Sequence, residues 1–171
     1  MSNGEDSPSR SGCHHATMAP YGIYNAGYDR YVVIAAINSR QWDRLTRAIG
    51  RPDLSNDPQF ITAGSRARNL PRVREVIEGW LQNFTNVEDA LKILEEYEVP
   101  SAPILTIEQL LQDQQYLMRN NLIEIEDPIF GKAKLPTTPI VFSETSTKNP
   151  EPPPSVGQHT EEVLKNIVGS Q

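Results

Sequence analysis

The stretch YDRYVVIAAINSRQWDRLTRAIG, residues 28–50, decides the fold because it joins a buried strand to an amphipathic helix. Its apolar run Tyr31–Ile37 is rich in β-branched and small residues, which predicts the strand. Asn38–Ser39 interrupts the run, and either side chain can cap a helix. The next apolar residues recur at spacings of three and four, as one helix stripe requires: Trp42, Leu45 and Ile49. Gly50 and Pro52 predict the end of the helix, so this stretch indicates an α/β or α+β domain and says nothing about chemistry.

Composition narrows the class of protein. The chain has 171 residues, of which 37% are apolar and 14 are prolines, and a net charge of −6. It lacks an apolar run long enough for a membrane span, its first ten residues lack the apolar stretch of a signal peptide, and its acidic balance disfavours nucleic acid. Cys13 is the single cysteine, which excludes an internal disulfide and fits a reducing compartment. We therefore expect one cytoplasmic domain with neither a membrane nor a nucleic acid as partner.

The N-terminal half predicts a hairpin followed by helices. Ala19–Tyr24 is expected to pair with Tyr31–Ile37 around the turn Asn25–Gly27. Tyr31–Ile37 is apolar on both faces, which predicts that helices cover it. Helices are expected over Ile61–Ala67, from Asn69 onward, and behind a capping box at Thr85–Glu88. The side chains expected to be largely buried are Trp42, Leu45, Trp80, Leu81 and Leu91.

The C-terminal half changes to the period of a strand. Leu122–Glu126 alternates apolar and acidic residues, so Glu124 and Glu126 are interpreted as a solvated strand face rather than as an acid–base pair. Lys132–Leu135 and Ile140–Phe142 are predicted as further strands. Together with the helices between residues 38 and 118, these strands predict an α+β fold with several helices packed on a small, mainly antiparallel sheet.

The last segment predicts an extended connection and a helix. Thr145–Ser155 is rich in proline, serine, threonine and glutamate and reads as a linker. Thr160 is expected to cap a terminal helix, whose first turn carries Glu161 and Glu162.

The sequences of these motifs and their order along the chain resemble those of the class III CoA-transferases. This family includes formyl-CoA transferase and the L-carnitine and bile-acid CoA-transferases. The first matching motifs are Ala35–Ala36, Asn38–Trp42, Gly50–Leu54 and Asp57–Phe60. The others are Gly12–Gly22, Val99–Ile104, Asp127–Ser143 and Pro152–Leu164. The chain departs from the family at Glu98, where glycine is usual. The resemblance covers residues 12–167 and only the C-terminal portion of a family member.

The resemblance implies a domain organisation. Residues 1–18 would be the linker from a missing N-terminal large domain, and residues 19–144 the small domain of a CoA-transferase. Residues 145–171 would be the proline-rich linker and a helix that packs on the large domain in full-length relatives. The family also forms interlocked dimers, which implies a homodimer or oligomer.

The resemblance also implies a chemistry whose nucleophile lies elsewhere. The family moves CoA between an acyl-CoA thioester and a carboxylic acid through an aspartyl intermediate, which is nucleophilic catalysis by a carboxylate. That aspartate belongs to the large domain, so no catalytic residue is assigned in this chain and the isolated chain is predicted to be inactive. Coenzyme A or acyl-CoA is the implied substrate of the complete enzyme, and no covalently bound cofactor is implied. The sequence would then represent a truncated form of a longer protein, a fragmentary gene product or one half of a split enzyme.

One segment is implied to lie at the substrate cleft. In the family, the segment that corresponds to Gly12, Cys13, His14 and His15 enters the small domain near the active site. Cys13 and His14 replace the usual asparagine and arginine. A cysteine beside two histidines also suggests a metal site, but the sequence offers no second cluster of ligands, so no metal is predicted.

Three alternatives remain open. Racemases of 2-methylacyl-CoA in the same superfamily carry Leu-Glu-Pro where this chain has Ile37-Asn38-Ser39, and the missing carboxylate favours a transferase. A non-catalytic interaction domain with the same fold is the second alternative. A basic cluster on one predicted helical region is interpreted as a solvated face, with a phosphate site as the alternative: Arg66, Arg68, Arg72 and Arg74.

Overall fold

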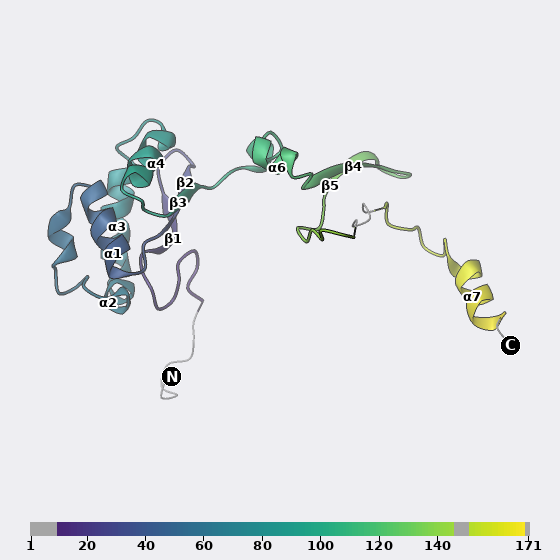
Figure 1. The fold of residues 1–171 in the computed structure, drawn as a ribbon, viewed down its shortest axis with the longest axis horizontal. Helices are drawn as coiled ribbons and strands as arrows, with labels where there is room; N and C mark the ends of the chain where they lie inside the picture. Colours follow the sequence, from purple (N-terminus) through teal and green to yellow (C-terminus); the bar gives the residue numbers. More distant parts are fainter. Residues whose placement is uncertain (1–9, 146–150, 170–171) are drawn as a thin grey trace, which may run out of the picture. The chain divides into compact units, whose positions relative to one another are not determined.

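The computed structural model describes residues 10–145 and 151–169 of the chain (Figure 1). The chain divides into two compact units, Met1–Ile104 (unit 1) and Leu105–Gln171 (unit 2). Both units combine helices with antiparallel strands, which confirms the α+β class. The first residues of the predicted interdomain linker and part of the proline-rich linker lie outside the described residues.

Unit 1 packs four α-helices beside a three-stranded sheet. Its strands are β1 (Tyr21–Asn25), β2 (Tyr31–Ala35) and β3 (Ser101–Pro103). Its helices are α1 (Ser39–Ala48), the 3₁₀ helix η1 (Pro52–Ser55), α2 (Ala63–Arg68), α3 (Leu70–Leu81) and α4 (Val87–Glu96). The strand order is β1-β2-β3 with antiparallel pairing throughout, and Figure 1 shows the four α-helices to one side of the strands. The predicted hairpin is confirmed.

Within the described part of unit 1, helices cover one face of the sheet. Val32, Ile34 and Ala36 are fully buried, whereas Tyr31 is exposed and Val33 is half-buried. This alternation corrects the expectation that both faces of the strand lie under helices, and the strand ends at Ala35 rather than at residue 37. The second face of β2 is also apolar, but it is only partly buried, because the helices pack on the opposite side of the strand.

Helix α1 follows the local signals closely. The side chain of Asn38 accepts a hydrogen bond from the backbone N–H of Gln41, and the side chain of Gln41 accepts one from the backbone N–H of Asn38. This reciprocal pair is a capping box and satisfies two of the free N–H groups at the start of the helix. Gly50 has a φ of +71°, the left-handed conformation expected after the helix.

The capping box predicted at the start of helix α4 is not observed. Its N-cap is Asn86, which makes no side-chain capping hydrogen bond, so the capping box predicted at Thr85 is wrong. The carbonyl oxygen of Thr85 instead accepts a hydrogen bond from the guanidinium of Arg30 at the end of the hairpin turn. Glu98, two residues beyond the end of the helix, has a φ of +55° and is left-handed. This conformation explains why glycine suits that position in the family pattern.

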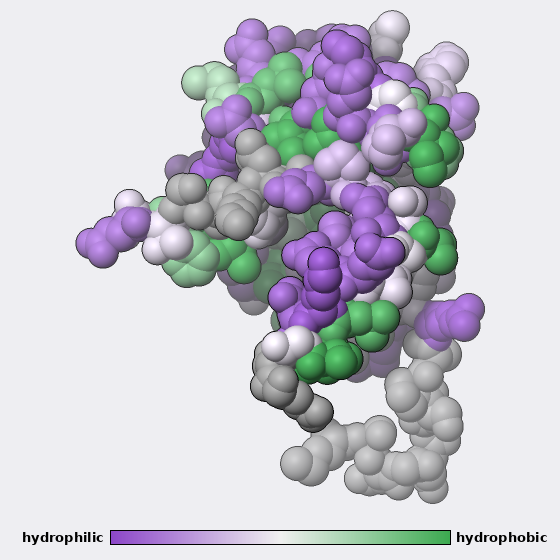
Figure 2. All heavy atoms as spheres, turned by 90° about the vertical axis from the view of Figure 1, so that its right-hand side faces the viewer, coloured by the Kyte–Doolittle hydropathy of each residue, from purple (hydrophilic) through white to green (hydrophobic). Residues whose placement is uncertain are grey.

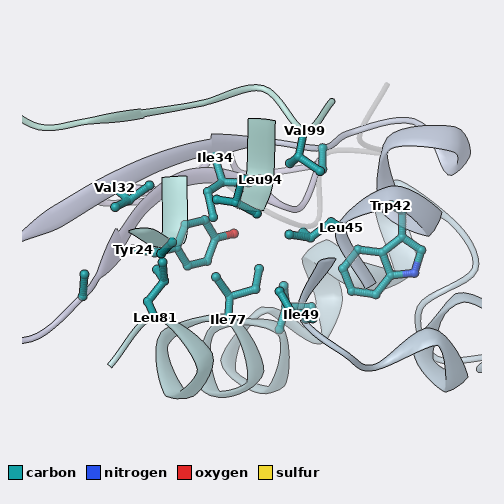
Figure 3. Packing of buried hydrophobic residues seen from close by; sticks show 14 of the residues in the cluster. Tyr24, Val32, Ile34, Trp42, Leu45, Ile49, Ile77, Leu81, Leu94 and Val99 are labelled. Carbon is teal, nitrogen blue, oxygen red and sulfur yellow. The ribbon is translucent and has the colours of Figure 1, made fainter. Parts of the chain in front are cut away.

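The hydrophobic core lies between the helices and the covered face of the sheet (Figure 3). Trp42, Leu45 and Leu81 are buried, as predicted. Trp80 and Leu91 are only partly buried and pack against the margin of the core, which corrects two of the five core predictions. Both lie at the edge of their helix stripes, where a wide apolar pattern continues past the covered face.

Unit 2 contains short helices, a hairpin and a terminal helix. Its helices are α5 (Ile107–Leu110), α6 (Gln114–Met118) and α7 (Thr160–Val168), and its strands are β4 (Leu122–Asp127) and β5 (Gly131–Pro136). In the hairpin, Glu124 lies opposite Lys134 and Glu126 opposite Lys132. These exposed pairs of opposite charge favour the observed register and confirm the interpretation of a solvated strand face.

Two expectations for unit 2 are wrong. Residues 140–142 form no strand, because Pro139 precedes them and no neighbouring strand pairs with them among the described residues. Thr160 is the first residue of α7 rather than its cap, and the N-cap is His159. Many apolar side chains of this unit are exposed. Figure 2 shows hydrophobic residues (green) among hydrophilic ones (purple) on one face of the molecule. No helix in the described part of the chain is long and apolar enough to cross a membrane.

Candidate functional site

A hollow of about 460 Å³ opens beside strand β1, next to the segment predicted to lie at the substrate cleft. Three parts of unit 1 form its walls: residues 11–14, the β1–β2 hairpin, and one side of helix α3. Gly12, Cys13 and His14 all line it, whereas His15 does not. Three of the four predicted residues are therefore brought together at one hollow.

The segment Gly12–His15, here called the edge segment, extends the sheet at β1. The backbone N–H of His15 donates to the carbonyl oxygen of Tyr21 at 2.8 Å, and that of Ile23 donates to the carbonyl oxygen of Cys13 at 3.0 Å. The resulting bridge places His14 opposite Gly22. A Cβ atom at Gly22 would lie 2.6 Å from the carbonyl oxygen of Cys13 and would overlap the ring of His14. Only glycine therefore lets the edge segment approach β1 this closely.

His14 is the least exposed member of the edge segment. Its Nδ1 atom is buried and has no hydrogen-bond partner among the described residues. Its ring meets the ring of Tyr24 edge-on, with 4.9 Å between the ring centroids. Burial lowers the pKa of His14 below 6.5, and the positive charge of Arg74 lowers it further, while Glu78 opposes them. The neutral ring is therefore favoured at neutral pH.

His15 and Cys13 face different surroundings. The ring of His15 stacks on that of Tyr21 with 5.4 Å between centroids, and its Nδ1 accepts a hydrogen bond from the backbone N–H of Thr17 at 3.2 Å. Cys13 is exposed and its thiol is free. The described residues contain no group of three or more His, Cys, Asp or Glu side chains placed to bind a metal ion.

Helix α3 contributes a charged pair to the opposite wall. Arg74 and Glu78, one turn apart, are joined by an ion pair of 3.1 Å. The carboxylate of Glu78 also accepts a hydrogen bond from the backbone N–H of Asn25 at 3.3 Å, which ties α3 to the end of β1. The hollow thus offers both a cation and an anion to a polar ligand. Their spacing of four residues on a predicted helix was a visible signal, but their position opposite the edge segment was not.

Tyr24 lies beneath the site and was also missed. In Figure 3 its side chain extends into the hydrophobic cluster, with the hydroxyl oxygen directed toward Leu45. The hydroxyl group is buried without a hydrogen-bond partner among the described residues. Burial, and to a lesser degree the charge of Glu78, raises the pKa of Tyr24, so its hydroxyl stays protonated.

Replacing Tyr24 with phenylalanine is expected to raise the free energy of unfolding by about 1 kcal/mol, because it removes an unpaired buried hydroxyl and keeps the ring. Tryptophan fluorescence during urea unfolding measures this change in unit 1, which contains both tryptophans. The matched control is Tyr28→Phe, whose ring is 89% exposed and whose change should be close to zero. A loss of stability in Tyr24→Phe would contradict the prediction and assign a partner to the hydroxyl.

The basic cluster separates into two kinds of residue. Arg68, Arg72 and Arg74 are exposed, as a solvated face requires. Arg66 is fully buried, so the interpretation of a solvated face is wrong for this residue. The period of the helix places Arg66 toward the interior, where backbone carbonyl groups take the place of water.

Arg66 links three separate parts of unit 1. Its Nε donates to the carbonyl oxygen of Ala19 at 2.6 Å, and its two terminal nitrogens donate to those of Phe60 and Ile37, each at 2.8 Å. Its guanidinium also lies 5.0 Å from the ring centroid of Trp42. Burial lowers the pKa of Arg66 to about 10, so the side chain remains a cation at neutral pH. This contact fixes the chain where it leaves the edge segment and enters β1.

Comparisons with known proteins identify a common family. The sequence model described as CoA-transferase family III matches residues 1–160. The succinyl-CoA–D-citramalate CoA-transferase of Chloroflexus aurantiacus is 30% identical over 161 residues, which cover 94% of this chain and 40% of that protein. A formyl-CoA:oxalate CoA-transferase of Bradyrhizobium is 31% identical, covering 75% of this chain and 30% of that protein. The human succinyl-CoA:glutarate CoA-transferase is 26% identical, covering 96% of this chain and 37% of that protein.

A solved structure gives the same result for the fold. The crystal structure of a CAIB/BAIF family protein from Brucella suis matches with a TM-score of 0.68 and 27% identity. The match covers 95% of this chain and 41% of that protein. The chain thus spans well under half the length of each of these relatives.

Proposed function

This chain belongs to CoA-transferase family III, and from that premise we propose that it forms the C-terminal part of an enzyme that moves CoA between an acyl-CoA thioester and a carboxylic acid. One observation carries the proposal: the family match extends over residues 1–160, and the relatives reported above are all named as CoA-transferases. Their names differ in the acyl group and in the acid, which leaves the transfer of CoA as the shared reaction.

The proposed mechanism uses a carboxylate outside this chain. An aspartate of the large domain attacks the thioester carbonyl, and the CoA thiolate leaves, which gives a mixed anhydride. The thiolate then attacks the aspartyl carbonyl, which releases the first acid and leaves an aspartyl-CoA thioester. The acceptor carboxylate attacks that thioester, which expels the CoA thiolate and forms a second anhydride. The thiolate then attacks the acceptor's carbonyl carbon, which gives the new acyl-CoA and releases the aspartate carboxylate. In this scheme the edge segment supplies one wall of the substrate cleft and no reacting atom.

The residue Asn38 distinguishes the proposal from a racemase. It occupies the position where the superfamily's racemases carry a glutamate, and its side chain is engaged in capping α1 through a 2.8 Å hydrogen bond. An amide in that role provides no carboxylate for proton transfer. When the chain is co-expressed with a large domain, the transferase proposal requires that a 2-methylacyl-CoA keep its α-proton in deuterated water.

The isolated chain is expected to show no CoA transfer, and co-expression with a large domain that carries the aspartate is expected to restore it. Transfer from succinyl-CoA or formyl-CoA to oxalate, glutarate or citramalate is measured by chromatography, because these are the substrates named for the relatives. The matched control is the same pair of proteins with the aspartate of the large domain replaced by asparagine. Turnover by the isolated chain would contradict the proposal, as would a restored pair that survives the asparagine substitution.

We also propose that helix α7 is covered by the large domain of the complete enzyme or by a second copy of the chain. The described residues of unit 2 bury no residue of α7, and Val163, Leu164 and Ile167 are all exposed. A nine-residue helix is marginal alone in water, so a covering surface would stabilise it.

The cytoplasmic location of the protein stays a prediction.

In the absence of the large domain, the chain is expected to form a concentration-dependent oligomer through α7. Light scattering across about a hundredfold dilution measures the mass, which should fall toward that of a monomer as the chain is diluted. Ile167→Glu should shift the chain to the monomer, because it places a charge in the apolar stripe. Val156→Glu, at a fully exposed position of the same unit, is the matched control and should leave association unchanged. A monomer at every concentration would contradict this expectation.

A further inference from the structure

The edge segment is held on β1 by a contact that depends on an uncharged imidazole. Two backbone hydrogen bonds dock it, and the ring of His14 lies against Gly22 between them. The neutral ring can carry its proton on Nε2 and present only a lone pair at the buried Nδ1. A protonated ring must also carry a proton on Nδ1, where the described residues provide no acceptor.

The groups that face His14 do not offset the energetic cost of protonating its buried ring. From β1, Tyr24 presents a neutral aromatic ring, and from β2, Tyr31 lines the same hollow. From α3, Arg74 repels a positive ring and Glu78 attracts it. The carboxylate of Glu78 is already engaged with Arg74 and with the N–H of Asn25, which weakens its hold on a further cation. Within the edge segment itself, the neighbouring Cys13 has an exposed thiol.

We propose that His14 makes the edge segment a pH-sensitive latch, docked on β1 when its imidazole is neutral and released when the imidazole is protonated. Release would free the N–H of Ile23 and the carbonyl group of Tyr21, which leaves β1 as an open sheet edge. It would also remove one wall of the hollow. The latch is a property of unit 1 and does not depend on the proposed transferase activity.

The direction of the pH effect follows from linkage. The docked state lowers the pKa of His14, whereas the released segment returns it to about 6.5. The contribution of the neutral ring to docking is therefore fully present well above pH 6.5 and is lost as the pH falls below that value toward the pKa of the docked state. For a single proton, the equilibrium constant for docking changes at most about tenfold per pH unit.

Amide hydrogen exchange in the full chain tests the latch at one atom. The N–H of Ile23 reports docking, because its acceptor is the carbonyl oxygen of Cys13. Its protection, corrected for the intrinsic pH dependence of exchange, is expected to fall between about pH 7.5 and about pH 5, by at most about tenfold for each pH unit. The N–H of Ile49, bonded to Leu45 at the end of α1, is the internal reference and should keep its protection. Unchanged protection of Ile23 over this range would overturn the proposal.

Two histidine variants assign the effect. His14→Phe keeps an aromatic ring against Tyr24 and cannot be protonated, so its Ile23 protection should not depend on pH. His15→Phe is the matched control, because His15 is the neighbouring histidine outside the hollow, and it should respond like the original chain. Equal loss of protection in His14→Phe and the original chain would overturn the proposal. If His14→Phe does not dock at pH 7.5, His14→Gln replaces it as the non-titrating variant.

A second measurement does not require a docked variant. The proton on the ring carbon between the two nitrogens of His14 gives its pKa directly by NMR titration. We expect that pKa to lie below 6.5 in the original chain and to return to about 6.5 in Gly22→Ala, which displaces the edge segment. An ordinary pKa for His14 in the original chain would overturn the latch.

Discussion

Replacing Arg66 with methionine is expected to lower the free energy of unfolding of unit 1 by about 3–5 kcal/mol, because several buried carbonyl groups lose their donor at once. The acceptors belong to Ala19, Phe60 and Ile37, which are far apart in the sequence. Their loss therefore loosens the connections among the segment just before β1, the segment just after β2 and the segment before α2. Urea unfolding followed by tryptophan fluorescence measures the change.

Two variants separate this role from a general effect of charge. Arg68→Met removes an exposed arginine from the same helix and should change stability by less than about 0.5 kcal/mol. Arg66→Lys keeps the positive charge but lacks the planar fork that reaches several carbonyl groups, so it should be nearly as destabilising as Arg66→Met. Equal stabilities of Arg66→Met and Arg68→Met would show that the buried hydrogen bonds contribute little.

The second large effect is expected at Leu45. Leu45→Ala should lower the free energy of unfolding by about 2–5 kcal/mol, because the leucine is completely buried in the cluster and its truncation leaves a cavity. The melting temperature of unit 1 should fall by many degrees, as read from tryptophan fluorescence.

Leu91 provides the matched comparison. It packs against the same cluster but is only partly buried, so the same leucine-to-alanine change should cost clearly less. A melting curve of Leu45→Ala that coincides with that of Leu91→Ala would contradict the assignment of the core.

Local signals predicted the parts of the fold whose partners lie close in the sequence. The capping box of α1 joins Asn38 to Gln41, three residues apart, and its stripe and terminal glycine are equally local. The capping box predicted at Thr85 is not formed, and the observed partner of this residue is distant, because its carbonyl group accepts a hydrogen bond from Arg30, 55 residues away. The register of the β4–β5 hairpin was readable in part, since alternating charges identify its exposed face.

The candidate site was predicted only on the side that a motif identifies. Resemblance to a family brought attention to Gly12, Cys13 and His14, but nothing in a single sequence shows that Arg74 and Glu78 lie across the hollow from them. The buried Arg66 is missed for the same reason, since its acceptors are brought together only by the folded chain. Tyr24 resembles any strand tyrosine until the contacts of its ring and its hydroxyl are known.

The boundary between Ile104 and Leu105 has a practical consequence for spectroscopy. Every residue of the hydrophobic cluster, both tryptophans and all the walls of the hollow precede it. A shorter protein of residues 10–104 would retain Arg66 with all its acceptors and the hydrogen bond from the N–H of Ile104 to Tyr31. Its NMR spectrum would be simpler than that of the full chain, and it would lack the exposed apolar face of α7, through which we propose that the chain associates.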